Sequence, residues 1–287
     1  MNIVWELDFY SRPILDENQK KRWEVLVCEG AQSVADAPAE GFRYSQYLAN
    51  NQVNSIELKK ALQAAIEQAP VPPTRIRFFR YQMQNMIKRA CDELSIPVRL
   101  SRRALSLQQW LDDRKDTVYP QEPGYQAGKN PSVRPPIEVA QPLPDALIGQ
   151  QWTFVSLPAA DFSDMPEWEI DFSEGFPLSL AAVDSTTPIP GIIIYSERAT
   201  PLAAWMSGLE LGALTTQIGQ VSRLLLETGT SDTWILENLN TPALVKEAEQ
   251  FEKAKQQADG VHFVAVQADP AADSFAGFWL MQSRGFG

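Results

Sequence analysis

Large hydrophobic residues alternate with polar ones at the start of the chain. Trp5, Leu7 and Phe9 occupy every second position, with Glu6 and Asp8 between them. A period of two predicts a strand that buries one face and exposes the other. A turn at 16–18 and a second apolar stretch make the opening a predicted hairpin. The predicted strands of this opening are residues 5–10, 23–28 and 42–48.

The rest of the first half mixes helical and extended patterns. Asn54, followed three positions later by Glu57, resembles a capping box, and the apolar stripe after it stops at Pro70. Strands come first and then alternate with helices, which suits a mixed sheet covered by helices; an RNase H-like layout is one candidate. The remaining predicted elements are helical stripes at 58–66, 83–94 and 107–111 and strands at 75–80 and 98–100.

The second half repeats a strand–helix theme. Thr200 and Thr241 each precede a proline, so each is a predicted N-cap with proline in the first helical position. The predicted strands are residues 191–195, 233–239, 261–267 and 275–282. The fold class that follows is α/β with an α+β tendency, in two domains that each hold a mixed β-sheet with covering helices.

A proline-rich stretch separates the two halves. Residues 116–150 contain seven prolines, which is typical of a stiff extended linker. We therefore predict an N-terminal domain at 1–115, a linker at 116–150 and a C-terminal domain at 151–287.

Charge changes sharply between these halves. The whole chain carries −11, but residues 1–150 hold 19 basic and 18 acidic residues, whereas residues 151–287 hold 6 and 18. Residues 75–115 alone hold 10 basic and 4 acidic residues, a local balance of +6. A phosphate backbone responds to a local basic face, so this window is the predicted RNA-binding region. The acidic half is predicted to contact a protein partner or a second copy of the chain.

The basic window interleaves cations with aromatic rings. Cations neutralise phosphates, and exposed rings stack on unpaired bases, so the pattern favours single-stranded RNA. The competing interpretation is that Phe78 is core and the arginines only solvate one face. The candidate RNA-binding residues are Arg75, Arg77, Phe79, Arg80, Tyr81, Lys88, Arg89, Arg102 and Arg103.

Carboxylates on the opening strands give an alternative. Glu6 and Asp8 share a strand face, Glu24 lies on the neighbouring strand, and such a cluster could hold Mg²⁺ for phosphodiester hydrolysis by a metal-dependent nuclease of RNase H-like type. The competing interpretation is a solvent face with ion pairs to Arg12 or Arg22. Because no diagnostic ligand spacing is present, we predict no catalytic residues and no metal site.

Histidine, cysteine and cofactor motifs give little indication of further chemistry. His262 is the only histidine and lies in an apolar strand, so a structural role is predicted for it. Cys28 and Cys91 are expected to be buried, and neither a P-loop nor a glycine-rich dinucleotide motif occurs, so no cofactor is expected. No run of 18 apolar residues predicts a membrane span, and the acidic N-terminus is unlike a signal or transit peptide. We expect a cytoplasmic protein.

Several stretches resemble one known family. They are residues 5–13 (WELDFYSRP), 20–28 (KKRWEVLVC), 75–81, the proline-rich middle, 191–205 and 278–280. Together they are similar to RNA-binding translation activators of chloroplasts and cyanobacteria. The resemblance implies binding of A/U-rich 5′ leader RNA, translational control and support of photosystem I biogenesis, and it implies no catalytic residue. It suggests a cyanobacterial member. A protein-only photosystem assembly factor is the remaining alternative.

Overall fold

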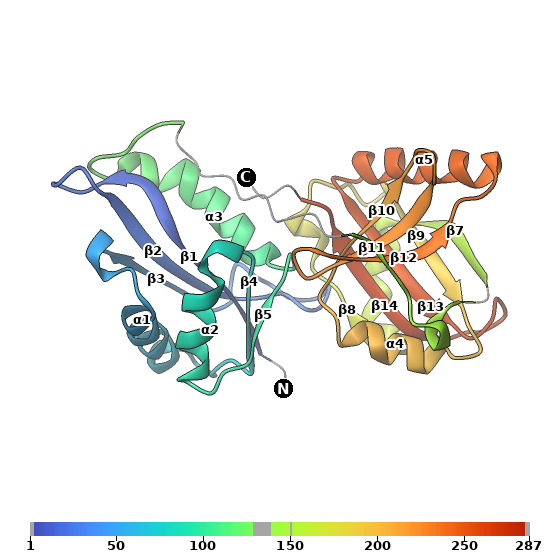
Figure 1. The fold of residues 1–287 in the computed structure, drawn as a ribbon, viewed down its shortest axis with the longest axis horizontal. Helices are drawn as coiled ribbons and strands as arrows, with labels where there is room; N and C mark the ends of the chain where they lie inside the picture. The colour runs from blue at the N-terminus through green and yellow to red at the C-terminus, as the bar shows by residue number, and fades with distance from the viewer. Residues whose placement is uncertain (1–2, 129–138, 150, 285–287) are drawn as a thin grey trace. The chain divides into compact units, whose positions relative to one another are not determined.

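The computed structural model describes residues 3–128, 139–149 and 151–284. The chain divides into two compact units (Figure 1). Unit 1 gathers Met1–Ala31 and Ala37–Pro135, and unit 2 gathers Gln32–Asp36 and Pro136–Gly285. Unit 2 is therefore discontinuous: the short segment Gln32–Asp36 belongs to it, and the Gly175 N–H donates to the Gln32 carbonyl at 2.8 Å.

Unit 1 contains a five-stranded sheet in the order β3-β2-β1-β4-β5. The first three strands are antiparallel neighbours, which confirms the predicted hairpin, and β4 and β5 run parallel to β1. Its strands are β1 (Val4–Leu15), β2 (Lys21–Glu29), β3 (Arg43–Leu48), β4 (Arg75–Phe78) and β5 (Val98–Leu100), and its helices are α1 (Ser55–Gln68), α2 (Gln84–Asp92) and α3 (Leu105–Thr117).

Helices α1 and α2 cover the face of this sheet that the alternation predicted to be buried. Trp5, Leu7 and Phe9 pack there in one core with apolar residues of both helices. Asn54 caps α1, because its side chain accepts the backbone N–H groups of Ile56 and Glu57. The N-cap half of the predicted capping box is thus confirmed, whereas the Glu57 carboxylate accepts from Lys60 instead of the cap backbone.

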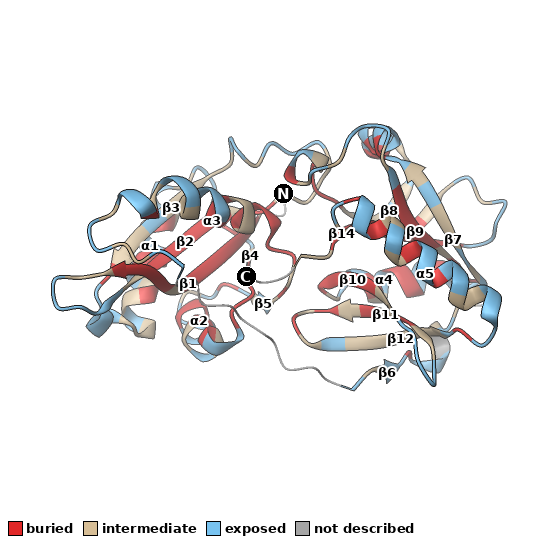
Figure 2. Cartoon of the chain, turned by 90° about the horizontal axis from the view of Figure 1, so that it is seen from above, coloured by how far each residue is buried: buried red, intermediate tan, exposed pale blue. Residues whose placement is uncertain are grey.

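Helix α3 covers the opposite face (Figure 1). The prediction that β1 exposes one face is therefore wrong: the residues between the large apolar ones are buried too, and Figure 2 shows the buried positions along β1 and β2 in red. Leu107, Trp110 and Leu111 of α3 pack with Leu26 and Cys28 of β2. Glu6 and Asp8 consequently lie in the interior, between the sheet and a helix.

Both described ends of the predicted linker take part in folded units. Tyr119 is buried in unit 1, and Gly124, with φ +85°, lets its carbonyl accept the Leu15 N–H at 2.9 Å. A Cβ at Gly124 would meet the Leu15 carbonyl oxygen at 2.2 Å. Strand β6 (Gln141–Pro142) joins a sheet of unit 2. Residues 129–138 of the predicted linker lie outside the described residues.

Unit 2 contains two sheets, in the orders β7-β9-β13-β14-β8 and β10-β11-β12-β6. Both sheets and both helices contribute to one core. The strands are β7 (Gln151–Pro158), β8 (Ile170–Glu174), β9 (Pro188–Tyr195), β10 (Leu211–Gln217), β11 (Arg223–Thr228), β12 (Asp232–Asn238), β13 (Val261–Gln267) and β14 (Phe275–Gln282), and the helices are α4 (Ala199–Ser207) and α5 (Pro242–Gln257).

Two helix starts were predicted in unit 2, and one is confirmed. The Thr241 side chain accepts the Leu244 N–H with Pro242 as the first helical residue. Helix α4 begins one residue before the predicted cap, Thr200, and Arg198 occupies the N-cap position. Strands β6, β7, β8, β10 and β11 were not predicted. The fold is a mixed α/β architecture with three mixed sheets.

Candidate nucleic-acid interface

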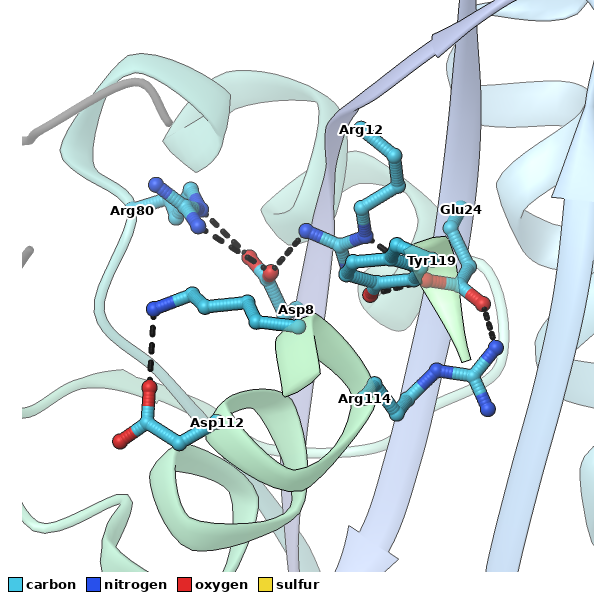
Figure 3. A network of polar contacts seen from close by, with 8 residues as sticks. Asp8, Arg12, Glu24, Arg80, Asp112, Arg114 and Tyr119 are labelled. Atoms are coloured by element: carbon cyan, nitrogen blue, oxygen red, sulfur yellow. Dashed lines mark hydrogen bonds and ion pairs between the residues drawn. The ribbon is translucent and has the colours of Figure 1, made fainter. Parts of the chain in front are cut away.

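Acidic side chains on β1 and β2 meet three arginines in the interior of unit 1, one from β1 itself, one from the segment after β4 and one from α3. The Asp8 carboxylate accepts the Arg80 Nε at 2.6 Å and the Arg12 Nη1 at 2.8 Å (Figure 3). Asp8 is 0 % exposed. Burial by itself raises the pKa of Asp8, but the charges of Arg80 and Arg12 outweigh it, and the pKa is lowered below its ordinary value.

Glu24 forms the second half of this network. Its carboxylate accepts the Arg12 Nε at 2.7 Å and the Tyr119 hydroxyl at 2.7 Å, and it is paired with Arg114 of α3 (Figure 3). Arg12 bridges Asp8 and Glu24. The ion pairs connect two strands, the segment after β4 and helix α3, and the hydrogen bond from Tyr119 adds the segment that follows α3.

Glu6 holds the amino-terminal end of α3. Its carboxylate accepts the Leu107 backbone N–H at 2.7 Å. Leu107 is the third helical residue, so this N–H has no partner within the helix, and an acid here also favours the positive end of the helix dipole. The helix has no side-chain cap of its own, and Glu6 supplies one from the sheet.

These contacts differ from the metal site that the nuclease alternative would require. The carboxylates of Asp8 and Glu24 are neutralised by arginine, and no group of three or more metal-ligating side chains occurs among the residues that the structure describes. The predicted ion pair with Arg12 is present, but it is buried instead of solvated. The pair predicted as an alternative, with Arg22, is not formed here, because Arg22 bonds to Glu122.

The candidate RNA-binding residues separate into buried and accessible groups. Four are buried and face the interior: Arg77, Phe79, Arg80 and Arg103. A guanidinium that is 4 % exposed and bonded to Asp8, like that of Arg80, offers no surface to a phosphate. At these four positions, the alternation of arginines with aromatic residues is therefore explained by packing in the interior and not by RNA contact.

The remaining candidates are at least partly accessible. Tyr81 is 47 % exposed, Lys88 and Arg89 lie on the outer side of α2, and Arg75 and Arg102 are half-buried. Tyr81 follows β4 and Arg102 follows β5, so both lie beyond the carboxyl ends of parallel strands, where ligands of α/β sheets often bind. Arg99, on the edge strand β5, is also exposed.

Part of the basic excess is neutralised internally. Arg80 and Arg114 belong to the window 75–115, but their partners, Asp8 and Glu24, lie outside it. The +6 balance therefore overstates the surface charge of this region. Neither arginine lies on a strand, since Arg80 follows β4 and Arg114 belongs to α3, so an acid–arginine pattern on neighbouring strands does not reveal these pairs.

Unit 2 shows no comparable cluster of accessible cations among its described residues. Its histidine is buried, as predicted for a structural role: the Nε2 of His262 accepts the Leu214 N–H at 2.8 Å. No described helix has the length and hydrophobicity needed to cross a bilayer.

Comparison with known proteins adds the context for this geometry. Residues 4–114 match the family model described as "RNA-binding protein Tab2/Atab2 N terminal", and residues 130–282 match that of the C-terminal domain. A maize protein named "Protein TAB2 homolog, chloroplastic" is 40 % identical over 96 % of this chain and 70 % of its own length. The Arabidopsis thaliana protein of the same name is 40 % identical over 96 % of this chain and 74 % of its own length. No solved structure matches.

Proposed function

This chain belongs to the Tab2/Atab2 family of RNA-binding proteins, and from that premise we propose that it binds single-stranded A/U-rich RNA and activates translation in photosystem I biogenesis. The observation that supports the proposal is the match of both family domains to this chain, together with 40 % identity over nearly its whole length. The names of the relatives place them in chloroplasts. A cytoplasmic location for this chain stays a prediction.

We infer that unit 1 has an RNase H-like layout that does not cut RNA. The strand order β3-β2-β1-β4-β5, with the first three strands antiparallel and β4 and β5 parallel to β1, supports the layout. Asp8 lies on the first strand, where a nuclease of this kind would need a metal ligand, and both of its oxygens are bonded to arginine. Metal-dependent cleavage needs carboxylates that are free to converge on an ion.

The RNA would contact the accessible part of the basic window. Tyr81 and Arg102 lie at the carboxyl ends of β4 and β5, and Lys88 and Arg89 lie on α2, the helix that joins those strands. Arg89 is 71 % exposed and has only a long, 3.5 Å ion pair to Glu93, so it can turn toward a phosphate at little cost. The tyrosine ring would stack on an unpaired base while the cations neutralise the backbone.

The test is a gel shift with an A/U-rich RNA of about 20 nucleotides, repeated at several salt concentrations. The variant Lys88→Ala/Arg89→Ala/Arg102→Ala should bind at least tenfold more weakly, with a shallower salt dependence, because each lost phosphate contact lowers the slope by about 0.7. The control Lys20→Ala/Lys21→Ala/Lys60→Ala removes the same charge from other exposed positions of unit 1.

Three outcomes separate the alternatives. Equal weakening in both triple variants would mean that general charge, and not this surface, binds the RNA. Absence of binding by the folded chain would favour a protein-only assembly factor. Cleavage of the RNA that requires added Mg²⁺ or Mn²⁺ would favour the nuclease.

A further inference from the structure

Strand β7 forms one edge of the five-stranded sheet of unit 2, and only β9 is its neighbour (Figure 1). The two strands pair antiparallel over all eight residues of β7 without a register shift. The sequence of β7, QWTFVSLP, contains no charged residue and no proline before its last position. None of its residues is buried (Figure 2).

An edge strand of this kind is unusual because natural sheets protect their edges. Lysines, bulges, prolines or covering elements normally prevent pairing with another chain. Among the described residues, the backbone of β7 has no backbone partner other than β9. Its outward-facing N–H and C=O groups therefore form a template for one more strand.

The other sheet of unit 2 shows how this fold closes an edge. Strand β10 is the edge there, and side chains occupy its backbone groups. His262 accepts the Leu214 N–H at 2.8 Å, Lys255 donates to the Leu214 carbonyl at 2.7 Å, and Glu252 accepts the Thr216 N–H at 2.8 Å. One edge of unit 2 is thus capped by side chains of α5 and β13. The side-chain bond described for the backbone of β7 is a local one, from the Thr153 hydroxyl to the Phe154 carbonyl at 3.3 Å, and no other element supplies it.

The charge of the chain segment that forms β7 and continues past its end indicates which partner fits. Residues 151–197 contain no lysine or arginine. The 3₁₀ segment that follows β7, Ala159–Glu167, carries three exposed acids, Asp161, Asp164 and Glu167. A second copy of this acidic unit would meet charges of the same sign, whereas a basic segment would be attracted toward the end of the strand.

We propose that β7 is the docking edge for an extended, basic peptide segment of a partner protein, which adds a sixth strand to the sheet. Main-chain hydrogen bonds to β7 hold the peptide, and alternate side chains lie against Trp152 and Phe154 on one face and Val155 and Leu157 on the other. The added strand runs antiparallel, the slightly more stable arrangement, so the lysines at its amino-terminal end reach the acids that follow β7.

The experiment measures fluorescence polarisation of labelled peptides with the full chain. The probes are an array of eight-residue peptides of alternating valine, isoleucine and threonine, each with three lysines or three glutamates at its amino terminus. Lysine-tailed peptides should bind at least tenfold more tightly than glutamate-tailed ones. N-methylation of alternate backbone nitrogens, which removes the hydrogen bonds and keeps the side chains, should abolish binding.

A pair of variants locates the binding. Thr153→Lys/Ser156→Lys places two charges on exposed positions of β7 and should weaken peptide binding at least tenfold. Gln256→Lys/Gln257→Lys adds the same charge at the exposed end of α5 and should change the affinity less than twofold. Thermal unfolding of each variant establishes that it is folded.

The proposal is overturned if no peptide of the array binds, if N-methylated peptides bind equally well, or if the β7 variant binds like its control. A concentration-dependent dimer in sedimentation velocity that the β7 variant removes would instead assign this edge to a second copy of the chain. Because these measurements contain no RNA, their outcome is independent of the gel shift.

Discussion

Replacement of Asp8 by asparagine should destabilise unit 1 far more than the same change at a surface position. Asparagine keeps the shape of the side chain but removes its charge. Arg80 then loses the ion-pair partner described for it, and Arg12 keeps Glu24, which it shares with Arg114. Breaking a buried ion pair in this way costs about 3–5 kcal/mol, because an uncompensated charge remains in a medium of low polarity.

The matched control is Asp112→Asn on α3, which Figure 3 shows beside the network as part of a separate ion pair. Asp112 is 56 % exposed and pairs with Lys115 one helical turn away. An exposed pair of this spacing contributes about 0.3–0.5 kcal/mol. The two substitutions make the same chemical change within one unit and differ mainly in burial.

Hydrogen exchange measured by mass spectrometry is the suitable assay, because peptides from β1 and β2 report on unit 1 alone. At about 1.4 kcal/mol for each tenfold, Asp8→Asn should accelerate exchange of the slowest amides there by roughly 100- to 4,000-fold, and Asp112→Asn by roughly twofold. Acceleration by Asp8→Asn within tenfold of the control would refute the view that this network holds unit 1 together.

Four further outcomes follow from the same contacts. The pKa of Asp8 is lowered in the folded chain, so its ionised carboxylate contributes to the stability of unit 1 above the ordinary pKa of about 3.9. This stability is lost as the pH falls through the lower pKa of the folded chain. Hydrogen exchange in β1 should therefore depend more steeply on pH below about 4 in the parent chain than in Asp8→Asn. Glu6→Ala leaves an N–H of the first turn of α3 without its partner and should cost about 1–2 kcal/mol, seen as faster exchange in peptides of α3. His262→Phe removes the acceptor of the Leu214 N–H and should cost about 1–3 kcal/mol, measured by thermal unfolding of unit 2. Burial raises the pKa of Cys91 to about 12, so its thiol should react with iodoacetamide at pH 8 only after denaturation.

Local sequence patterns predicted most helices and strands of unit 1, because the signals for these elements lie within the elements or next to them. The alternation around Trp5 predicted β1, and Asn54 predicted the start of α1, since a cap bonds only to residues two and three positions ahead. The same alternation could not show that the second face of β1 is covered. Helix α3, which covers it, lies about a hundred positions away, and its helical pattern does not reveal which sheet face it meets.

The candidate site was predicted less completely for a related reason. A charge sum over neighbouring positions cannot detect that Arg80 is paired with Asp8, 72 positions away. The burial of Arg77 and Phe79 could not be predicted from the local sequence either, because it depends on tertiary packing. The edge strand β10 escaped prediction as well, since His262 and Lys255 from later in the chain satisfy part of its backbone.

The segment Gln32–Asp36, which packs as part of unit 2, affects the order in which the chain can fold during synthesis. Its partner at Gly175 leaves the ribosome long after the segment itself. At a synthesis rate of about 5–20 residues per second, the interval is on the order of ten seconds. The hairpin of β1 and β2 can form in this time, whereas the segment 32–36 still lacks its partner. The folding of unit 2 is therefore complete only when early and late parts of the nascent chain meet. A fragment that starts at residue 136 would lack the segment 32–36 of this unit. Supplying residues 32–36 in trans, as a synthetic peptide, should slow the proteolysis of such a fragment.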